Sequence, residues 1–336
     1  MSEPDQPPTP DHLTALLKEG DHQGTVACLD QVGAADAETR KRSLRAVRDV
    51  AEEQSRSFNG LASPLSTFLT DDDRAVRLTT AKLFVTLSRV EPAAVLPAVD
   101  ALAERLADDE EFYYVRARSA EALGYVAADS PEDVTDPETL ADLRIGLEFD
   151  EPEVKEKLAK ALAYVALGDP GRLSHQVDSL AEHLDDDNEL VRYHLCTSLV
   201  VVGCEYPEKL SGAAEPLRER LGDENPYVQG RAAEALALLA ASETGVGSGF
   251  DPDDAAGAHE DPPTFLTDRL SFCRWQLASD KSADAPEGIG TIESIRDGTD
   301  AIIEDMNAPD GEACPHCGLD LPESGPPMCP RCGAPR

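Results

Sequence analysis

The feature that most constrains this chain is a segment that recurs at intervals of 37 to 39 residues. Each copy follows a short acidic stretch and carries a landmark valine, with apolar or small residues 4, 5, 7, 8 and 11 positions later. Repeats of this length are typical of units that are too small to fold alone and must stack on one another. We expect six units between about residues 25 and 241. Their landmark positions are Thr39, a weaker first copy, and then Val76, Val115, Val154, Val191 and Val228.

Each unit is predicted to contain two helices. The first is exemplified by AVLPAVDALAERL, in which Val95, Val99, Leu102 and Leu106 share one face. An acidic turn follows and leads into a second helix, which carries the landmark valine. The apolar face of the second helix is too wide for one helix to cover alone, so neighbouring units must bury it. This pattern predicts an all-α fold of stacked helix pairs.

The succession of acidic turn, Val115-Arg116 and Ala122-Leu123-Gly124 resembles HEAT repeats, of the short kind grouped with phycobilisome-lyase-like repeats. The resemblance covers about 215 residues and implies a HEAT-like solenoid, a right-handed α-α superhelix of about six helix pairs. It also implies a ladder between acidic turns and the basic residue after each landmark valine. We interpret the ladder as structural, because an acidic side chain at a helix start satisfies free backbone amides. The ladder maps onto Asp71 with Arg77, Glu110 with Arg116 and Asp186 with Arg192, shifts at Lys155 to Asp150, and has no basic residue at Gln229.

Acidic residues outnumber basic residues by 66 to 30, which gives a formal net charge of −36. We therefore expect no direct nucleic-acid binding by the solenoid, because neutralising phosphates requires lysine and arginine. Only 8 of the basic residues are lysines, and this composition resembles that of proteins from salt-loving archaea. Molar salt screens the repulsion between carboxylates within about 3 Å. We predict a halophilic protein; the alternative is an acidic protein that repels or mimics nucleic acid.

The beginning of the chain, MSEPDQPPTPDH, has neither the basic nor the apolar region of a signal peptide. No stretch approaches the roughly 18 apolar residues of a membrane span. We expect a cytoplasmic protein with no membrane partner.

Two accessory helices are predicted after the repeats. In TFLTDRLSFCRWQLASD the residues Leu266, Leu270, Cys273 and Leu277 share one face, and we expect this helix to cap the solenoid with Trp275 as its anchor. The second, TIESIRDGTDAIIEDMN, contains a glycine that lowers helix stability, so it should need a docking surface or a second copy of itself. The sequence leaves these two possibilities open, and it leaves the oligomeric state open as well.

The C-terminal segment CPHCGLDLPESGPPMCPRCG predicts a zinc ribbon. Its cysteines Cys314, Cys317, Cys329 and Cys332 form two C-P-x-C-G knuckles separated by eleven residues. Four thiolates favour tetrahedral Zn(2+) and leave no open position for catalysis. So short a segment cannot bury a core, so the metal must supply most of its folding free energy. We expect a structural or protein-docking ribbon; a disulfide pair and a nucleic-acid contact are the alternatives.

The composition and motifs together divide the chain into five parts. They are a disordered N-terminus (1–10), the HEAT-like solenoid (11–241), an acidic flexible linker (242–263), the two accessory helices (264–307) and the zinc ribbon (314–336).

The sequence does not favour an enzyme. HEAT-like repeats resemble those of the iron-dependent deoxyhypusine hydroxylases, but the only His-Glu pair, His259-Glu260, lies in the linker. Nothing supports a phycobilin lyase, no phosphate-binding glycine loop is present, and no nucleophile has a convergent base. The cysteines outside the ribbon fall mainly on apolar helix faces, where cysteine usually serves as packing. They are Cys28, Cys196, Cys204 and Cys273.

A candidate binding surface runs along the second helices. Positions 2, 3, 6 and 10 after each landmark avoid the packing face, and in a HEAT-like superhelix they would line the concave groove. We call these positions the lane. The lane carries eight basic and four acidic residues, although the chain is strongly acidic. Its candidate partner-binding residues are Lys41, Arg42, Arg45, Lys82, Arg118, Tyr125, Lys157, Lys160, Tyr164, Tyr193 and Arg231.

Two interpretations of the lane remain open. The bases could pair with acidic neighbours on the helix surface and do no more. Alternatively, the lane could receive an acidic peptide or helix, because arginine pairs with carboxylates in a fork and tyrosine gives contact area at low entropic cost. We favour a non-enzymatic adaptor that binds a protein partner in this groove. The alternatives are a regulator of nucleic-acid machinery that uses the ribbon and, from resemblance to some archaeal HEAT proteins, a taxis or motility signalling adaptor.

Overall fold

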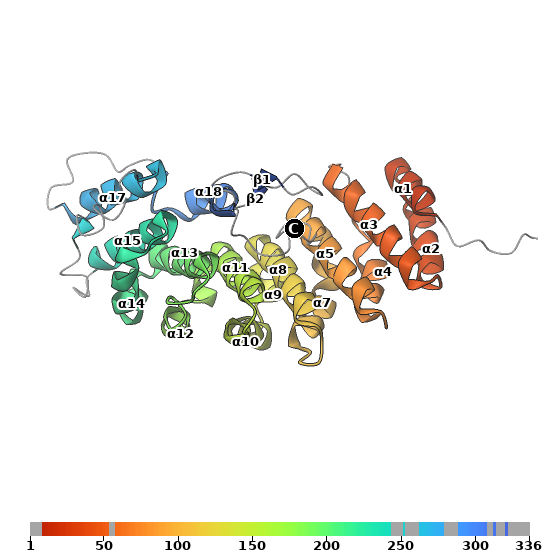
Figure 1. The fold of residues 1–336 in the computed structure, drawn as a ribbon, viewed down its shortest axis with the longest axis horizontal. Helices are drawn as coiled ribbons and strands as arrows, with labels where there is room; N and C mark the ends of the chain where they lie inside the picture. The colour runs from red at the N-terminus through yellow and green to blue at the C-terminus, as the bar shows by residue number, and fades with distance from the viewer. Residues whose placement is uncertain are drawn as a thin grey trace, which may run out of the picture. The chain divides into compact units, whose positions relative to one another are not determined.

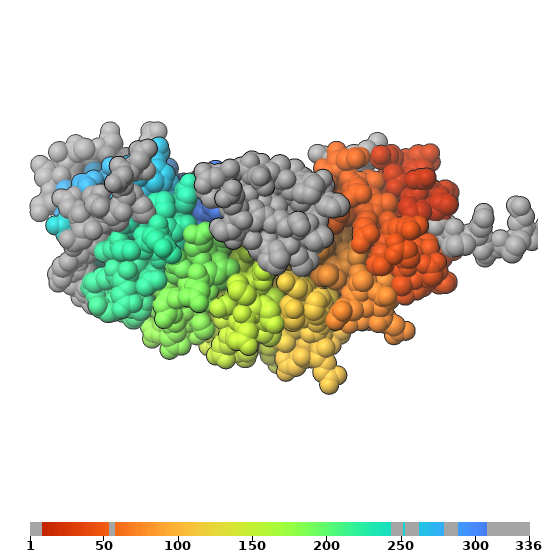
Figure 2. Space-filling view, in the orientation of Figure 1, coloured from red at the N-terminus to blue at the C-terminus, as the bar shows by residue number. Residues whose placement is uncertain are grey.

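The computed structural model describes residues 9–53, 58–242, 251–252, 262–278, 288–307, 312–313 and 320–321 (Figure 1). The chain forms two compact units, unit 1 (Met1–Glu148) and unit 2 (Phe149–Arg336). Within each unit the repeats follow one another in chain order, as the colour bands of Figure 2 show. Among the described residues, none of the helices combines the length and apolar character needed to cross a lipid bilayer.

Unit 1 is built on three long second helices that pack in sequence order, α3 (Ala37–Glu53) against α5 (Arg74–Val90) and α5 against α8 (Tyr113–Asp129). Shorter helices connect them and form a second layer. These are α1 (Pro10–Glu19), α2 (His22–Gly33), α4 (Ala62–Ser66), η1 (Thr67–Thr70), α6 (Pro92–Val95), η2 (Leu96–Ala98), α7 (Val99–Ala107), α9 (Pro131–Val134), α10 (Pro137–Ile145) and η3 (Gly146–Glu148).

Unit 2 repeats this arrangement with α11 (Pro152–Gly168), α13 (Glu189–Glu205) and α15 (Pro226–Ala240) as second helices. A further layer of two helices, α17 and α18, lies across them (Figure 1). The remaining elements are η4 (Pro170–Arg172), α12 (Val177–Ala181), η5 (Pro207–Ala213), α14 (Ala214–Glu219), η6 (Arg220–Gly222), α17 (Thr264–Leu277), α18 (Ile292–Asn307), β1 (Glu312–Ala313) and β2 (Asp320–Leu321).

The repeat pattern correctly predicts the core. All five landmark valines are 0% exposed, so each sits between neighbouring helices as expected. The first helices are more broken than the sequence suggested. The segment expected as one helix over AVLPAVDALAERL divides into α6, η2 and α7, because Pro97 lacks the backbone N–H that would continue the α-helical hydrogen bonding. Its apolar face survives the break, since Val95, Val99, Leu102 and Leu106 all remain buried.

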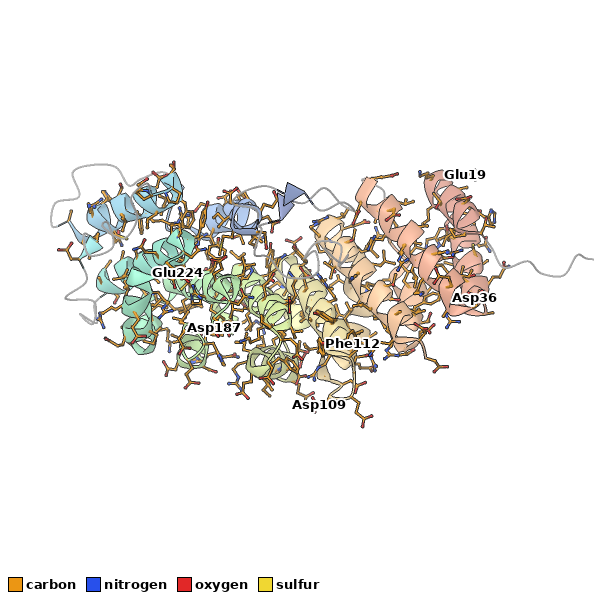
Figure 3. All side chains as sticks on the ribbon, viewed as in Figure 1. Glu19, Asp36, Asp109, Phe112, Asp187 and Glu224 are labelled. Carbon is orange, nitrogen blue, oxygen red and sulfur yellow. The ribbon has the colours of Figure 1, made fainter. Side chains whose placement is uncertain are left out.

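The acidic turns cap the second helices. The Asp73 carboxylate accepts hydrogen bonds from the amides of Ala75 and Val76 at the start of α5. Asn188 and Asn225 do the same for α13 and α15. Figure 3 labels Asp36, Asp109, Asp187 and Glu224 on these turns. Capping explains why α3, α5, α13 and α15 begin directly after an acidic or amide side chain. α8 begins after Phe112 and α11 after Glu151, and neither residue caps its helix through the side chain.

At four positions the ladder forms with a carboxylate from the following repeat. Arg192 donates through Nη1 to the backbone carbonyl of Asp186, 2.7 Å away, and through Nε and Nη2 to the Asp223 carboxylate at 2.8 and 2.9 Å. Arg77 likewise binds the Asp71 carbonyl at 2.7 Å and the Glu111 carboxylate. For Arg77 and Arg192 the expected pairing with their own turn is therefore a backbone contact. Arg116 instead pairs with the Asp109 carboxylate of its own turn at 3.3 Å, in place of the expected Glu110, and donates through Nε to the Leu106 carbonyl at 2.8 Å. The same forward pairing joins Arg40 to Asp71, and Lys155 to Asp186 in place of the expected Asp150.

The exception at Gln229 now has a structural reason. Gln229 donates through Nε2 to the Leu221 carbonyl at 2.6 Å, so it keeps the contact with its own turn. It lies in α15, the last of the six repeats, and no further repeat turn follows to supply a carboxylate. An arginine there would bring a buried charge without its second partner.

Some sequence predictions concern residues outside the described ranges. They include most of residues 1–10, most of the linker over 242–263, and the four ribbon cysteines. The described residues beside the first knuckle are strands β1 and β2, which pair antiparallel, Glu312 with Leu321 and Ala313 with Asp320.

Candidate partner-binding surface

The part of the lane in unit 2 is covered by the chain's own accessory helices. α18 packs on α13 and α11, and α17 packs on α15 (Figure 1). The lane residues beneath are buried rather than open to solvent. Their exposed fractions are 6% for Lys157, 8% for Lys160, 8% for Tyr164, and 0% for Tyr193 and Arg231.

α18 is the acidic amphipathic helix of the pair. It contains five acidic residues and one basic residue. One face is buried through Ile295, Thr299, Ile302 and Met306. The opposite face is exposed and holds most of its charges. The open question about residues 291–307 is answered for this chain, because the helix docks on its own second helices.

Three polar contacts fix the position of α18. The Tyr164 hydroxyl of α11 donates to the Asp300 carboxylate at 2.5 Å. The Arg296 guanidinium donates to the carbonyl of Leu167 at the end of α11, at 2.7 Å. The Tyr227 hydroxyl lies 3.3 Å from the Asp305 carboxylate. Nearby, Lys160 Nζ stands 5.8 Å from the centre of the Tyr164 ring. A lane tyrosine thus binds a carboxylate of the chain's own helix α18.

α17 closes the lane over α15 by apolar packing. Leu266, Leu270 and Cys273 are buried as the sequence predicted, whereas Trp275 is half-buried and stacks on Phe272 with ring centres 6.2 Å apart. The expected anchor is therefore a secondary contact. α17 lies alongside a second helix over the lane.

A glycine in the lane permits the close approach of α17. A Cβ on Gly230 would lie 2.7 Å from Phe265 Cε1, closer than side-chain atoms approach one another. The Phe265 ring fills that space, and the Arg269 guanidinium stacks on it with its Cζ 3.5 Å from the ring centre. The absence of a side chain at lane position Gly230 thus makes room for the Phe265 ring.

A buried charge cluster lies between α15 and α17. Arg231 and Glu234 are both 0% exposed and form an ion pair of 2.8 Å, and Arg269 approaches the same carboxylate at 3.3 Å. The Gly290 amide donates to Glu234 at 3.0 Å. Burial and the neighbouring Arg231 lower the pKa of Arg269 to about 10. Burial also opposes the charge of Arg231, but Tyr193 and Glu234 outweigh it and raise the pKa of Arg231. Arg231 is therefore an internal ion-pair residue in this chain.

The part of the lane in unit 1 is more accessible at its beginning. Arg42 and Arg45 are exposed, and Lys41 is partly exposed. Lys41 and Arg42 both pair with Glu38, at 2.8 and 3.1 Å, one helical turn earlier. Further along, Lys82 is half-buried, Arg118 pairs with Glu121 at 2.6 Å, and Tyr125 is 9% exposed. The structure therefore divides the eleven candidate residues into three in α3, of which two are exposed, three in α5 and α8 that are half-buried or buried, and five buried ones in unit 2.

α5 adds to the basic character of unit 1. Its sequence, RAVRLTTAKLFVTLSRV, contains four basic residues and no acidic residue. The chain as a whole carries 66 acidic residues against 30 basic ones. A positive surface on so acidic a chain attracts anionic groups.

An aromatic cluster at the start of α8 was not singled out from the sequence. Phe112, Tyr113 and Tyr114 lie with ring centres 4.7 to 5.3 Å apart, and all three are half-buried. Arg74 of α5 stacks on Phe112, with its Cζ 4.4 Å from the ring centre. The run of three consecutive aromatics in a chain with only 5% aromatic residues was the available signal.

The cysteines of the repeats and of α17 have the character of packing residues. Cys28, Cys196 and Cys273 are buried, and Cys204 is half-buried. Burial raises the pKa of both Cys196 and Cys204 to about 12, so neither forms a thiolate readily. Among the described residues, no group of three or more histidine, cysteine or acidic side chains is arranged to hold a metal ion.

Comparisons with known proteins support the repeat architecture. A family model described as HEAT repeats matches residues 99–200. The crystal structure of one engineered protein aligns with 88% of this chain and 71% of its own, at a TM-score of 0.58 and 19% identity. Another engineered protein aligns with 66% of this chain and all of its own, at a TM-score of 0.55 and 24% identity.

A designed armadillo repeat protein in complex with the peptide (KR)4 is also similar, over 68% of this chain and 98% of its own, at a TM-score of 0.50 and 20% identity. No curated protein matches the chain. These likenesses identify the fold as an all-helical solenoid of the armadillo and HEAT type.

Proposed function

We propose that this protein is a non-enzymatic adaptor that binds an acidic segment of a partner protein along the lane of unit 1. The observation that carries the proposal is the charge of that surface. Arg42 and Arg45 are exposed on α3, and the adjacent α5 places Lys82 in the lane and has no acidic side chain. Solubility does not account for a basic surface on a chain of net charge −36, and a binding role for anionic groups does.

The similar folds support a protein partner in general. Solenoids present extended surfaces built from successive repeats, and these suit extended peptides or helices. The designed armadillo neighbour binds a basic peptide, (KR)4. The lane of unit 1 has the opposite charge to such a peptide's binding site, so its partner should be acidic.

The structure also changes how the proposal must be tested. Lys157 and Lys160 are only 6% and 8% exposed, so reversing their charge would disrupt the fold rather than a free surface. The test therefore uses Lys41→Glu, Arg42→Glu and Arg45→Glu together. The matched control is Arg144→Glu, Arg172→Glu and Arg218→Glu, which changes the charge equally outside the second helices. The control is also matched in ion pairs, because two of the three residues in each variant lose a pair with an acidic neighbour within one turn.

The assay is a pull-down in molar potassium chloride with cross-linking and mass spectrometry. We expect a partner cross-linked to α3 and α5 through an acidic segment, lost from the lane variant and retained by the control. Equal loss from both variants would mean that only net charge matters. If the lane variant keeps the partner and a Cys314→Ser/Cys332→Ser variant loses it, the partner binds the C-terminal segment. That result would refute the proposal.

The C-terminal segment is proposed to bind one zinc ion through Cys314, Cys317, Cys329 and Cys332. The spacing of these four cysteines in two C-P-x-C-G knuckles supports this, because four thiolates at such spacing suit a tetrahedral zinc ion. The zinc would have a structural role.

A further inference from the structure

α18 occupies a helix-binding surface that has the character expected of a partner site. The surface consists of the faces of α11 and α13 that α18 contacts, and it includes Tyr164, with Lys160 Nζ 5.8 Å from the centre of the Tyr164 ring. Considered alone, these two lane residues favour an acidic helix, since they combine a cation with a tyrosine. The chain places an acidic helix there, and the Tyr164 hydroxyl binds its Asp300 carboxylate.

The contact that docks α18 on the second helices is small. α18 contacts α13 and α11 far less extensively than α17 contacts α15. Only Ile295, Thr299, Ile302 and Met306 of its sixteen residues are buried. Elements with few buried contacts lie at the low-stability end of a fold and open first.

The helix is also weakened from within. Gly298 lies in its middle, where glycine lowers helix stability relative to alanine. Packing does not require this glycine, because a Cβ there would meet only Ile302 Cδ1, at 3.9 Å. By contrast, Gly230 under α17 has no room for a side chain. The glycine of α18 therefore reduces the helix's stability without serving close contact.

We propose that α18 is an exchangeable occupant of this surface, which a partner's acidic amphipathic helix replaces. The replacing helix should carry apolar residues at the spacing of Ile295, Ile302 and Met306, and a carboxylate at the position of Asp300. Because α18 is tethered, it competes at a high local concentration and keeps the surface closed to weak ligands. A matching helix binds when it outcompetes the tethered one, and α18 is then released for other contacts.

The test uses the full chain and a labelled synthetic peptide with the sequence of residues 291–307, measured by fluorescence anisotropy. The variant Ile302→Asp/Met306→Asp places charges on the docked face and should release α18. Thr291→Asp/Ala301→Asp adds the same charge at exposed positions and serves as the control. We expect the released variant to bind the peptide at least about tenfold more tightly than the wild type and the control.

Two further variants keep the test decisive. Gly298→Ala should stabilise tethered α18 and weaken peptide binding by about threefold to fivefold, the opposite direction. Tyr164→Phe in the released variant removes only the hydroxyl that binds Asp300, and it should weaken the peptide. Hydrogen exchange of α11 and α13 checks that they stay folded. If they unfold in the released variant, Arg296→Ala/Asp300→Ala replaces it, since this pair removes two polar contacts and leaves the apolar face intact.

Two results would overturn the proposal. One is equal peptide affinity in the wild type and a folded released variant, which would mean that α18 does not compete for the surface. The other is no peptide binding to either, which would mean that α18 is a fixed part of the fold. The proposal rests on the adaptor role given above, but the two fail separately. Charge reversal in α3 should leave peptide binding unchanged, and release of α18 should leave cross-links on α3 and α5 unchanged.

Discussion

The buried ladder in unit 2 gives the sharpest stability prediction. Arg192→Ala removes two hydrogen bonds to the Asp223 carboxylate, at 2.8 and 2.9 Å, and one to the Asp186 carbonyl. The Arg192 and Asp223 side chains are only 7% and 2% exposed, so the variant removes the nearest counterion of a buried carboxylate and leaves only Arg220, whose Nη1 lies 3.6 Å from Asp223 Oδ2. Breaking a buried pair in this way costs about 3–5 kcal/mol. The Asn225 amide, 2.9 Å away, still donates to Asp223 and places the cost toward the lower end.

The control is Arg218→Ala. Arg218 pairs with Glu215 at 2.8 Å, but those side chains are 31% and 77% exposed. Exposed pairs contribute about 0–1 kcal/mol, and molar salt screens them further. For a unit of this size, a loss of about 3–5 kcal/mol in the free energy of unfolding lowers the thermal midpoint of Arg192→Ala by about 6–20 °C.

The assay is urea and thermal unfolding followed by circular dichroism in molar potassium chloride. Arg192→Ala/Asp223→Ala should recover part of the loss, because it also removes the stranded carboxylate. If Arg192→Ala costs no more than Arg218→Ala, the forward ladder contributes nothing to stability and our account of it is wrong.

Three further predictions concern metal, salt and pH. Purified protein should contain one zinc per chain, and Cys314→Ser/Cys332→Ser should lose it while keeping the helical circular dichroism of the repeats; absence of zinc from the wild type would exclude the ribbon. With 66 acidic residues, the thermal midpoint should be higher at about 2 M than at about 0.1 M potassium chloride, because salt screens self-repulsion; an equal or higher midpoint at low salt would contradict a halophilic protein. Burial raises the pKa of Cys196 from 9.0 to about 12, so the folded protein keeps a proton that the unfolded chain loses, and stability should fall as pH rises above 9. Denaturant titrations at several pH values should show a smaller fall in Cys196→Ala, and an equal fall would refute this origin.

The burial of several lane residues could not be predicted from the sequence of the repeats. The lane residues were selected because they avoid the packing face between repeats. Tyr193 and Arg231 avoid that face and are nevertheless fully buried, because residues far along the chain cover them. Phe265 and Arg269 reach Arg231 from α17, and Asp300 reaches Tyr164 from α18, 136 residues away in sequence. No periodicity within a repeat carries information about a helix that follows the last repeat.

The sequence by itself determined the repeat, the two-helix unit, the buried valines and the acidic helix starts. These properties depend on residues within about 40 positions of one another, and hydrophobic spacing and capping chemistry act at that range. The tertiary structure alone decided which carboxylate each ladder arginine binds, and which lane residues stay accessible. Arg192 follows Asp186 in sequence, yet its side chain extends to Asp223, because stacking brings the next turn within reach of Nε and Nη2. Stacking geometry and the docking of α17 and α18 are long-range outcomes of packing, which the order of residues within one repeat does not encode.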